Sequence, residues 1–185
     1  MIKWLRRRWR TVRKYFRLSI SSVELPWGLG KIDFAPNDEE RVAAWNLYIE
    51  LTTRISTQRL DPEAGMLREA LASLNSLFGF TRKTLSQCGP DVAYDLGPVA
   101  LSILNKGIRP FTAKWHPLLK SWEFHKPEDV SDLEHEQQWP HNAQMRAELV
   151  QLQDALREYA RALGKIAGVD SELHERLVKD EHKNA

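Results

Sequence analysis

The apolar residues between Pro140 and Ala167 constrain the fold more than any other feature of the sequence. They recur every three or four residues, a spacing that places them along one side of an α-helix. These residues are Met145, Leu149, Leu152, Leu156, Tyr159, Leu163 and Ile166. Gly168 follows the last of them, as glycine often does at the end of a helix. A one-sided helix of this length has to bury its apolar stripe, so the sequence predicts a helical bundle.

A second helix is predicted to begin after Asn37, a good N-cap that is followed by acidic residues, and to run to about Gln58. We expect the buried side of this helix to carry apolar residues at helical spacing, with Leu47 and Tyr48 beside them. These residues are Val42, Trp45, Ile49 and Ile55.

The next helix is predicted to open at Asp61-Pro62-Glu63, with Pro62 in the first helical position, and to continue to about Gln87. A further helical region is expected over residues 92–105, closed by Gly107 in the manner of a C-terminal glycine. Another begins near Pro110.

The polar residues 125–139 are predicted to form a loop before the long helix that ends at Ala167. The fold class that follows is all-α, an antiparallel bundle of four to five helices over residues 37–168. Residues 169–185 are predicted to be a charged tail.

Two short alternating runs precede the bundle, Ser19–Leu25 and Lys31–Phe34, with the turn-forming Pro26–Gly30 between them. They predict a short β-hairpin or extended arm over residues 21–36. This arm separates the bundle from a different kind of segment, residues 1–20.

Residues 1–20 are predicted to form a cationic amphipathic helix. The first 17 residues hold eight basic side chains, and no acidic residue occurs before Glu24. The remaining 19 basic and 25 acidic residues give residues 18–185 a net charge of about −6. Apolar side chains lie along one side of the predicted helix, basic ones fill the adjacent arc, and Trp4 and Tyr15 lie on the far flank. The predicted binding residues are Ile2, Leu5, Arg6, Arg7, Trp9, Arg10, Val12, Arg13, Lys14, Phe16 and Arg17.

Three kinds of partner suit such a helix. An anionic membrane surface is favoured, because Trp and Phe beside Arg is the composition of a helix that lies among lipid headgroups. Docking on a protein partner, on a second copy or on the acidic body of the chain itself is the next alternative. Nucleic acid is the third, since the basic residues can neutralise phosphates and Trp4 or Tyr15 can stack on bases.

The composition also narrows the compartment. Cys88 is the only cysteine, so an intrachain disulfide is excluded and a reducing compartment is favoured. No apolar stretch is long enough to span a bilayer. We therefore expect a cytoplasmic protein, with a peripheral position at the inner membrane face as one option. An organellar presequence stays an alternative if the host is eukaryotic.

The segment Ile108–Pro117 gathers Arg109, Lys114, Trp115 and His116 between two prolines. These four residues are candidates for a small-ligand or enzyme site, because they can converge on an anion or an aromatic ligand. The favoured alternative is packing, with Trp115 in the core and Arg109 bonded to helix-end carbonyls.

The sequence I-R-P-F-x-x-K-W-H-P in this segment resembles a stretch in uncharacterised bacterial all-helical proteins of anti-phage and other conflict systems. The resemblance extends over about Ile32–Glu123 and includes Ala44-Trp45-Asn46-Leu47-Tyr48. It implies a role in bacterial antiviral defence, and it assigns no activity to any residue.

No catalytic or metal-binding motif accompanies these features. His135 and His141 do not have the H-E-x-x-H spacing of a zinc helix, and Cys88 has no nearby histidine in the sequence. We therefore expect no cofactor, no metal and no enzymatic activity. The function predicted is that of a helical interaction module attached through residues 1–20, with homo-oligomerisation left open.

Overall fold

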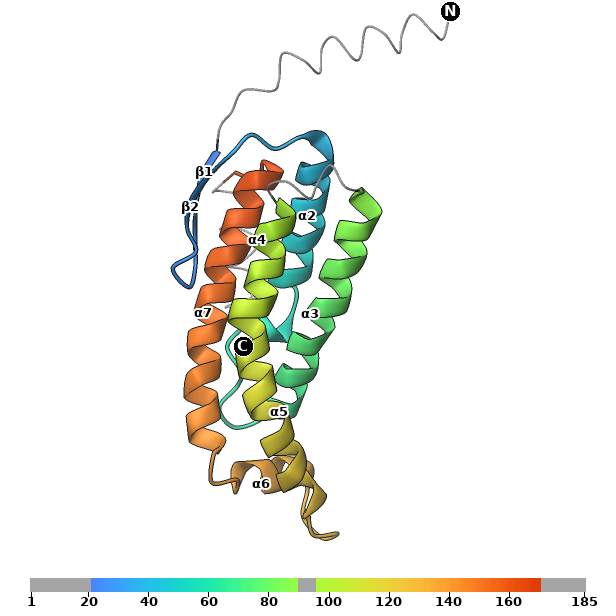
Figure 1. Cartoon of the computed structure of the whole chain (residues 1–185). Helices are drawn as coiled ribbons and strands as arrows, with labels where there is room; N and C mark the ends of the chain where they lie inside the picture. Colours follow the sequence, from blue (N-terminus) through green and yellow to red (C-terminus); the bar gives the residue numbers. More distant parts are fainter. Residues whose placement is uncertain (1–20, 90–95, 171–185) are drawn as a thin grey trace, which may run out of the picture.

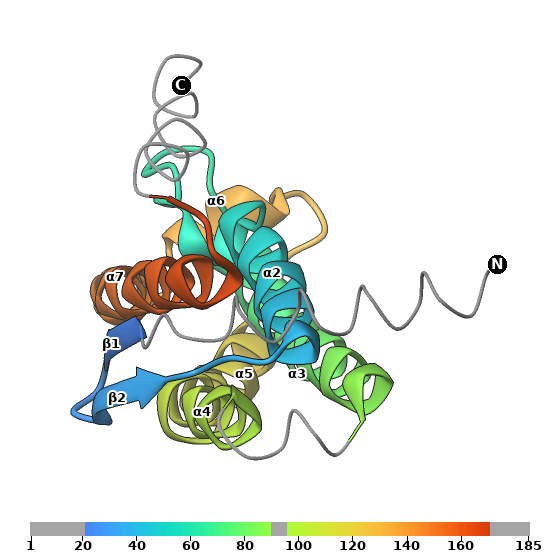
Figure 2. The ribbon, with the colours of Figure 1, turned by 90° about the horizontal axis from the view of Figure 1, so that it is seen from above.

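The computed structural model of the chain describes residues 21–89 and 96–170. Four long helical segments lie side by side and alternate in direction, as Figures 1 and 2 show. They are α2 (Asp38–Thr52), α3 (Leu67–Cys88), a rod made of α4 (Leu96–Ser102), η3 (Ile103–Ile108) and α5 (Arg109–Phe124), and α7 (Asn142–Ala167). The short η1 (Ile55–Thr57) and α6 (Asp132–Gln137) lie in the connections. The predicted all-α antiparallel bundle is confirmed.

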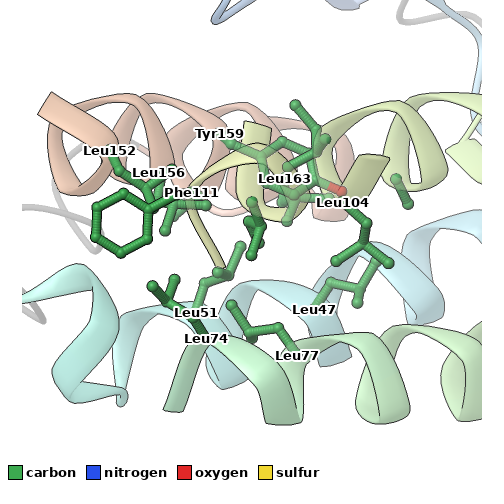
Figure 3. Packing of buried hydrophobic residues seen from close by; sticks show 14 of the residues in the cluster. Leu47, Leu51, Leu74, Leu77, Leu104, Phe111, Leu152, Leu156, Tyr159 and Leu163 are labelled. Atoms are coloured by element: carbon green, nitrogen blue, oxygen red, sulfur yellow. The ribbon is translucent and has the colours of Figure 1, made fainter. Parts of the chain in front are cut away.

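The core lies where the four segments face one another. Figure 3 shows leucines of α2 and α3 meeting side chains of the rod and of α7. Its labelled residues are Leu47, Leu51, Leu74, Leu77, Leu104, Phe111, Leu152, Leu156, Tyr159 and Leu163. A mostly apolar cavity among them measures only about 10 Å³, which is room for about one water molecule. This part of the core is therefore almost completely filled.

The predicted β-hairpin is also confirmed. Strands β1 (Ser21–Leu25) and β2 (Gly30–Phe34) pair antiparallel, from Ser21 opposite Phe34 to Leu25 opposite Gly30. Val23 and Leu25 are buried, and β1 packs against α7. The hairpin therefore lies along the side of the bundle, with its turn pointing away from the end at which α2 begins (Figure 1).

Helix α2 begins at the predicted N-cap, where Asn37 and Glu40 form a reciprocal capping box. The prediction of its buried side was wrong. Ala43, Ala44, Leu47, Tyr48 and Leu51 face the core, whereas Val42, Trp45, Ile49 and Ile55 are exposed. The helix has apolar residues at helical spacing on two opposite sides, so periodicity alone does not choose between them. The side that is buried carries Ala43 and Ala44, which are fully covered, and it packs mainly against α7.

The start of α3 differs from the prediction. Pro62 is not in the helix: the side chain of Asp61 accepts the backbone amides of Glu63 and Ala64 and closes a separate turn. The helix begins at Leu67, where Met66 provides no side-chain cap. The carboxylate of Glu136 supplies the cap instead, because it accepts the backbone amides of Leu67 at 2.6 Å and Arg68 at 3.0 Å.

Glu136 comes from α6, which lies inside the stretch predicted to be a loop. Ser131 and Glu134 form a capping box there, the local signal that the prediction missed. Arg146 of α7 completes the connection at this end of the bundle. Its guanidinium donates to the carbonyl oxygens of Asp61 and Gly65.

The rod of α4, η3 and α5 is continuous, although the sequence predicted an end at Gly107. In a regular α-helix the ring of Pro110 would clash with the carbonyl group four residues earlier. The π-helical turn η3 lies directly before Pro110, and the amide of Arg109 donates to the carbonyl oxygen of Leu104 across this wider turn. The extra width lets the rod continue past the proline.

Helix α7 matches the prediction closely. It ends at Ala167, and Gly168 adopts the left-handed conformation with φ of 87° expected of a C-terminal glycine. The predicted cationic helix and most of the predicted charged tail lie outside the described residues.

Candidate functional site

The predicted binding residues between Ile2 and Arg17 lie outside the described residues. The four candidates in the segment 109–117 all belong to α5, and the structure separates them. Lys114 and Trp115 meet at one carboxylate of α7. Arg109 and His116 are seven residues, or about two helical turns, apart, so they lie on the same side of α5 as each other. This side is not the one that carries Lys114 or Trp115.

Lys114 and Trp115 both contact Glu148. The Nζ atom of Lys114 lies 2.6 Å from Oε1 of Glu148, and Nε1 of Trp115 donates to Oε2 at 2.9 Å. Lys114 also lies over the Trp115 ring, with Nζ 4.2 Å from its centroid. The hydrogen bond from Lys114 is the main reason that the pKa of Glu148 lies below its usual value. This carboxylate is therefore held ionised by its neighbours.

The ring of Trp115 belongs to the core. Only 1% of the residue is exposed, and the ring meets those of Phe111, Trp139 and His141. The edge of Trp139 lies against it with centroids 5.7 Å apart. Trp115 thus packs in the core as predicted, while its ring nitrogen reaches Glu148 at the edge of the core.

Arg109 is exposed and contacts two neighbours. Its Nε donates to Oδ1 of Asn105 at 3.1 Å, and its guanidinium lies 5.2 Å from the centroid of the Phe78 ring. The contact with Phe78 connects the rod to α3, whereas Asn105 belongs to the rod itself. His116 is half-buried. It follows Trp115 directly in α5, so its side chain lies on a different side of the helix from that of Trp115. Arg109 and His116 therefore do not join Lys114 and Trp115 around one point.

An open groove of about 750 Å³ lies beside Lys114. It runs between α5, α7 and the tip of the hairpin, and Glu148 lies on its rim. The lining residues are Trp27, Gly107, Pro110, Phe111, Lys114, Glu148, Gln151, Leu152 and Ala155. The groove offers one paired lysine and one paired carboxylate, which can orient a polar group.

Trp27 forms the wall of this groove. Its backbone has a φ of 58°, an uncommon value for a bulky residue. Its ring lies on Gly107 in the π-helical turn, so that a Cβ atom added to Gly107 would come within 2.7 Å of the ring. A second open groove of about 640 Å³ lies on the other side of Trp27, between the hairpin and α7. Trp27, at the tip of the hairpin, thus lines both grooves.

His135 and Cys88 were considered for metal binding or catalysis, and the structure shows the surroundings of both. The buried His135 stacks on Trp122 with ring centroids 4.6 Å apart, and its Nε2 lies 2.9 Å from the carbonyl oxygen of Trp122. Burial, and secondarily the charge of Glu39, raises the pKa of the Cys88 thiol, which disfavours the thiolate. Within residues 21–89 and 96–170, no three histidine, cysteine or acidic residues are grouped to hold a metal ion.

Two features were missed by sequence reasoning. The first is the contact between Glu148 and Trp115. Glu148 is one of many polar residues in α7, and no local sequence pattern marks it as the partner of Trp115. The outward stripe of α2 was assigned to the core. Across the part of the chain that the structure describes, no helix is long and apolar enough to cross a membrane.

Comparison of the chain with protein-family models, with curated proteins and with solved structures found no match in any of the three.

Proposed function

We propose that the chain is a non-enzymatic helical interaction module that attaches through residues 1–20 to an anionic membrane surface. The observation that carries this proposal is the distribution of charge along the sequence. Eight basic residues and no acidic residue occupy the first 17 positions, while residues 18–185 carry about −6. Each basic residue near an anionic surface contributes about 1 kcal/mol, so this segment has far more affinity for such a surface than the bundle has.

The apolar positions of the segment favour lipid over nucleic acid. Ile2, Leu5, Trp9, Val12 and Phe16 fall on one side of the predicted helix. Burial of such a side among acyl chains adds to the electrostatic attraction. An arm that follows phosphates needs no apolar side, because counterion release alone supplies its affinity.

The bundle supports the proposal by where the segment joins it. Ser21 begins β1, whose Val23 and Leu25 are buried against the bundle. The segment therefore leaves from a fixed point at the end of the bundle where α2 begins and α7 ends (Figure 1). Attachment through residues 1–20 would hold that end toward the surface. A role in bacterial defence is part of the same proposal and rests only on the sequence resemblance.

Co-sedimentation of the full chain tests the proposal. Vesicles of phosphatidylcholine and phosphatidylglycerol should pellet the protein, and vesicles of phosphatidylcholine alone should not. The variant Trp9→Glu/Phe16→Glu should lose binding, because it places two carboxylates on the inserting side. Trp4→Glu/Tyr15→Glu is the matched control, since it makes the same change of charge on the far flank and should retain most of the binding. Arg→Lys changes in the segment should weaken binding only slightly.

Two results would contradict the proposal. If the Trp9→Glu/Phe16→Glu variant pellets as fully as the unchanged chain, insertion of the apolar side is wrong. If excess RNA strips the unchanged chain from the vesicles, nucleic acid is the preferred partner. A binding constant for RNA that falls steeply with salt and does not depend on Trp9 and Phe16 would then identify the second function.

A further inference from the structure

Helix α2 presents an apolar stripe to solvent on the side opposite the core. The stripe consists of Val42, Trp45 and Ile49, which are 56%, 41% and 37% exposed. Single apolar residues on a surface are ordinary, but these are spaced three and four residues apart and so form one continuous row. The ring of Trp45 is held in place by stacking on Tyr48, with centroids 5.8 Å apart. The α2 stripe is therefore an ordered surface suited to another amphipathic helix.

The end of the stripe nearest the start of α2 is acidic. Asp38, Glu39 and Glu40 occupy the first turn of the helix, and the side chains of Asp38 and Glu39 are exposed. A helix that brings basic residues to this end would find opposite charge there, in addition to apolar surface further along.

Residues 1–20 join the bundle close to this acidic end. Ser21 pairs with Phe34, and only residues 35–37 separate Phe34 from the first residue of α2. Four peptide steps cover at most about 14 Å, so Ser21 lies within about 20 Å of Asp38. Residues 17–20 in an extended form reach about 13 Å, and this brings the preceding residues to the side of α2.

The lengths also agree. Residues 1–16 as a helix measure about 24 Å, and the 15 residues of α2 measure about 22 Å. Residue 16 would lie near the start of α2 and residue 1 toward its end, so the two helices would be antiparallel. This direction places the last basic residues of the segment, among them Arg13 and Arg17, beside Asp38 and Glu39.

From these relationships we infer that residues 1–20 dock on the α2 stripe as an antiparallel amphipathic helix when no membrane is present. Ile2, Leu5, Trp9, Val12 and Phe16 supply the apolar side that covers Val42, Trp45 and Ile49. Under the proposed function, the same residues enter the lipid. The membrane and the α2 stripe therefore compete for one side of one helix, and this competition rests on the proposed function.

Limited trypsin digestion of the full chain in the absence of lipid tests the docking. The segment holds eight basic residues, and a docked helix is cut only when it opens, so the cleavage rate follows the population of the open form. Val42→Gln/Ile49→Gln removes apolar surface from the stripe, adds no charge and leaves the Trp45–Tyr48 stack intact. We expect cleavage within residues 1–17 to become roughly five-fold faster or more in this variant.

Leu118→Gln/Val150→Gln is the matched control. Leu118 and Val150 are 43% and 38% exposed and belong to other helices, so their substitution should leave the cleavage rate unchanged. Thermal unfolding of both variants shows whether the bundle stays folded. If the unchanged chain is cut as fast as Val42→Gln/Ile49→Gln, the docking is wrong. If its protection grows with protein concentration, a second copy covers the stripe, and docking within one chain is wrong.

Sedimentation with the anionic vesicles separates this inference from the proposed function. Val42→Gln/Ile49→Gln should bind them at least as well as the unchanged chain, because the competing surface is weakened. Protection from trypsin without vesicle binding would retain the docking and remove the membrane role. Vesicle binding without protection from trypsin would retain the membrane role and remove the docking.

Discussion

The carboxylate of Glu136 in α6 caps the first turn of α3 by accepting the backbone amide of Leu67 at 2.6 Å. Most helices are capped by a residue next to them in sequence, but here the cap lies 69 residues further along the chain. Glu136 is only 3% exposed, so water cannot replace it as a partner for the amides of Leu67 and Arg68.

Substitution of Glu136 should therefore cost much more stability than its position on a short helix suggests. We expect Glu136→Ala to lower the free energy of unfolding by about 2–4 kcal/mol, because two amide groups lose their acceptor. Gln138→Ala, at an exposed position next to the same helix, should change it by less than about 0.5 kcal/mol. Urea unfolding followed by circular dichroism measures both. Equal effects would show that the amides find other acceptors.

The titration of Glu136 gives this cap a pH dependence. Burial raises the pKa of Glu136 above its usual 4.5, although the amides of Leu67 and Arg68 act in the opposite direction. The folded chain therefore holds this proton more tightly than the unfolded chain, so the contribution of Glu136 to stability falls as pH rises from 4.5 through its raised pKa. The free energy of unfolding of Glu136→Gln should lack this pH dependence. The difference in stability between the unchanged chain and Glu136→Gln should therefore become smaller as pH rises from 4.5 through the raised pKa. A difference in stability that grows over this pH range would instead mean that folding lowers the pKa of Glu136.

Gly107 should tolerate no side chain while Trp27 is present. The ring of Trp27 lies only 2.7 Å from the position that the Cβ atom of an alanine would take, so we expect Gly107→Ala to destabilise the chain by about 1–3 kcal/mol. In a Trp27→Gly background the same substitution should be neutral or stabilising, since alanine favours helix and glycine suits the positive φ at residue 27. A double-mutant cycle measures the coupling, and additive effects would exclude the contact.

The two interpretations of the segment 109–117 differ in what its substitutions do to stability. Trp115→Ala should lower the free energy of unfolding by about 3–5 kcal/mol, because its buried ring leaves a cavity. Arg109→Ala and His116→Ala should each cost less than about 1 kcal/mol, since Arg109 is exposed and His116 is half-buried. Thermal unfolding of the three variants provides the comparison. A large loss for Arg109→Ala would make its contacts with Phe78 and Asn105 part of the packing.

Tyr159 carries a hydroxyl group that the fold does not use. The residue is 4% exposed, its hydroxyl has no hydrogen-bond partner among the described residues, and burial raises its pKa. Removal of an unsatisfied buried polar group relieves a desolvation cost, so Tyr159→Phe should raise the free energy of unfolding by about 1 kcal/mol. Calorimetry at neutral pH measures it. A loss of stability would mean that the hydroxyl is satisfied by water in the neighbouring cavity.

The sequence predicted best those elements whose signals are local. The N-cap at Asn37, the turn at Pro26–Gly30 and the end of α7 at Gly168 each depend on a few neighbouring residues, and the structure confirms all three. The stripe of α7 was also assigned correctly, because that helix has a single apolar side.

Errors arose where a distant residue decides the structure. Helix α2 has two apolar sides, and contact with α7 determines which one is buried. The start of α3 depends on Glu136, and the continuity of the rod depends on a π-helical turn that no propensity announces. For the candidate site, the meeting of Lys114 and Trp115 at Glu148 depends on how α5 packs against α7. Spacing along α5 shows only that Arg109 and Lys114 lie on different sides of it.

The distant cap of α3 also has a consequence for biosynthesis. While the ribosome has made only the first 130 or so residues, the amides of Leu67 and Arg68 have no carboxylate to accept them, and the core lacks the leucines of α7. The N-terminal half of the bundle can form helices at that stage but cannot close. The last third of the chain has to emerge first. Newly made chains that stall before Glu136 should therefore depend on chaperones, whereas completed chains should fold in a single cooperative step.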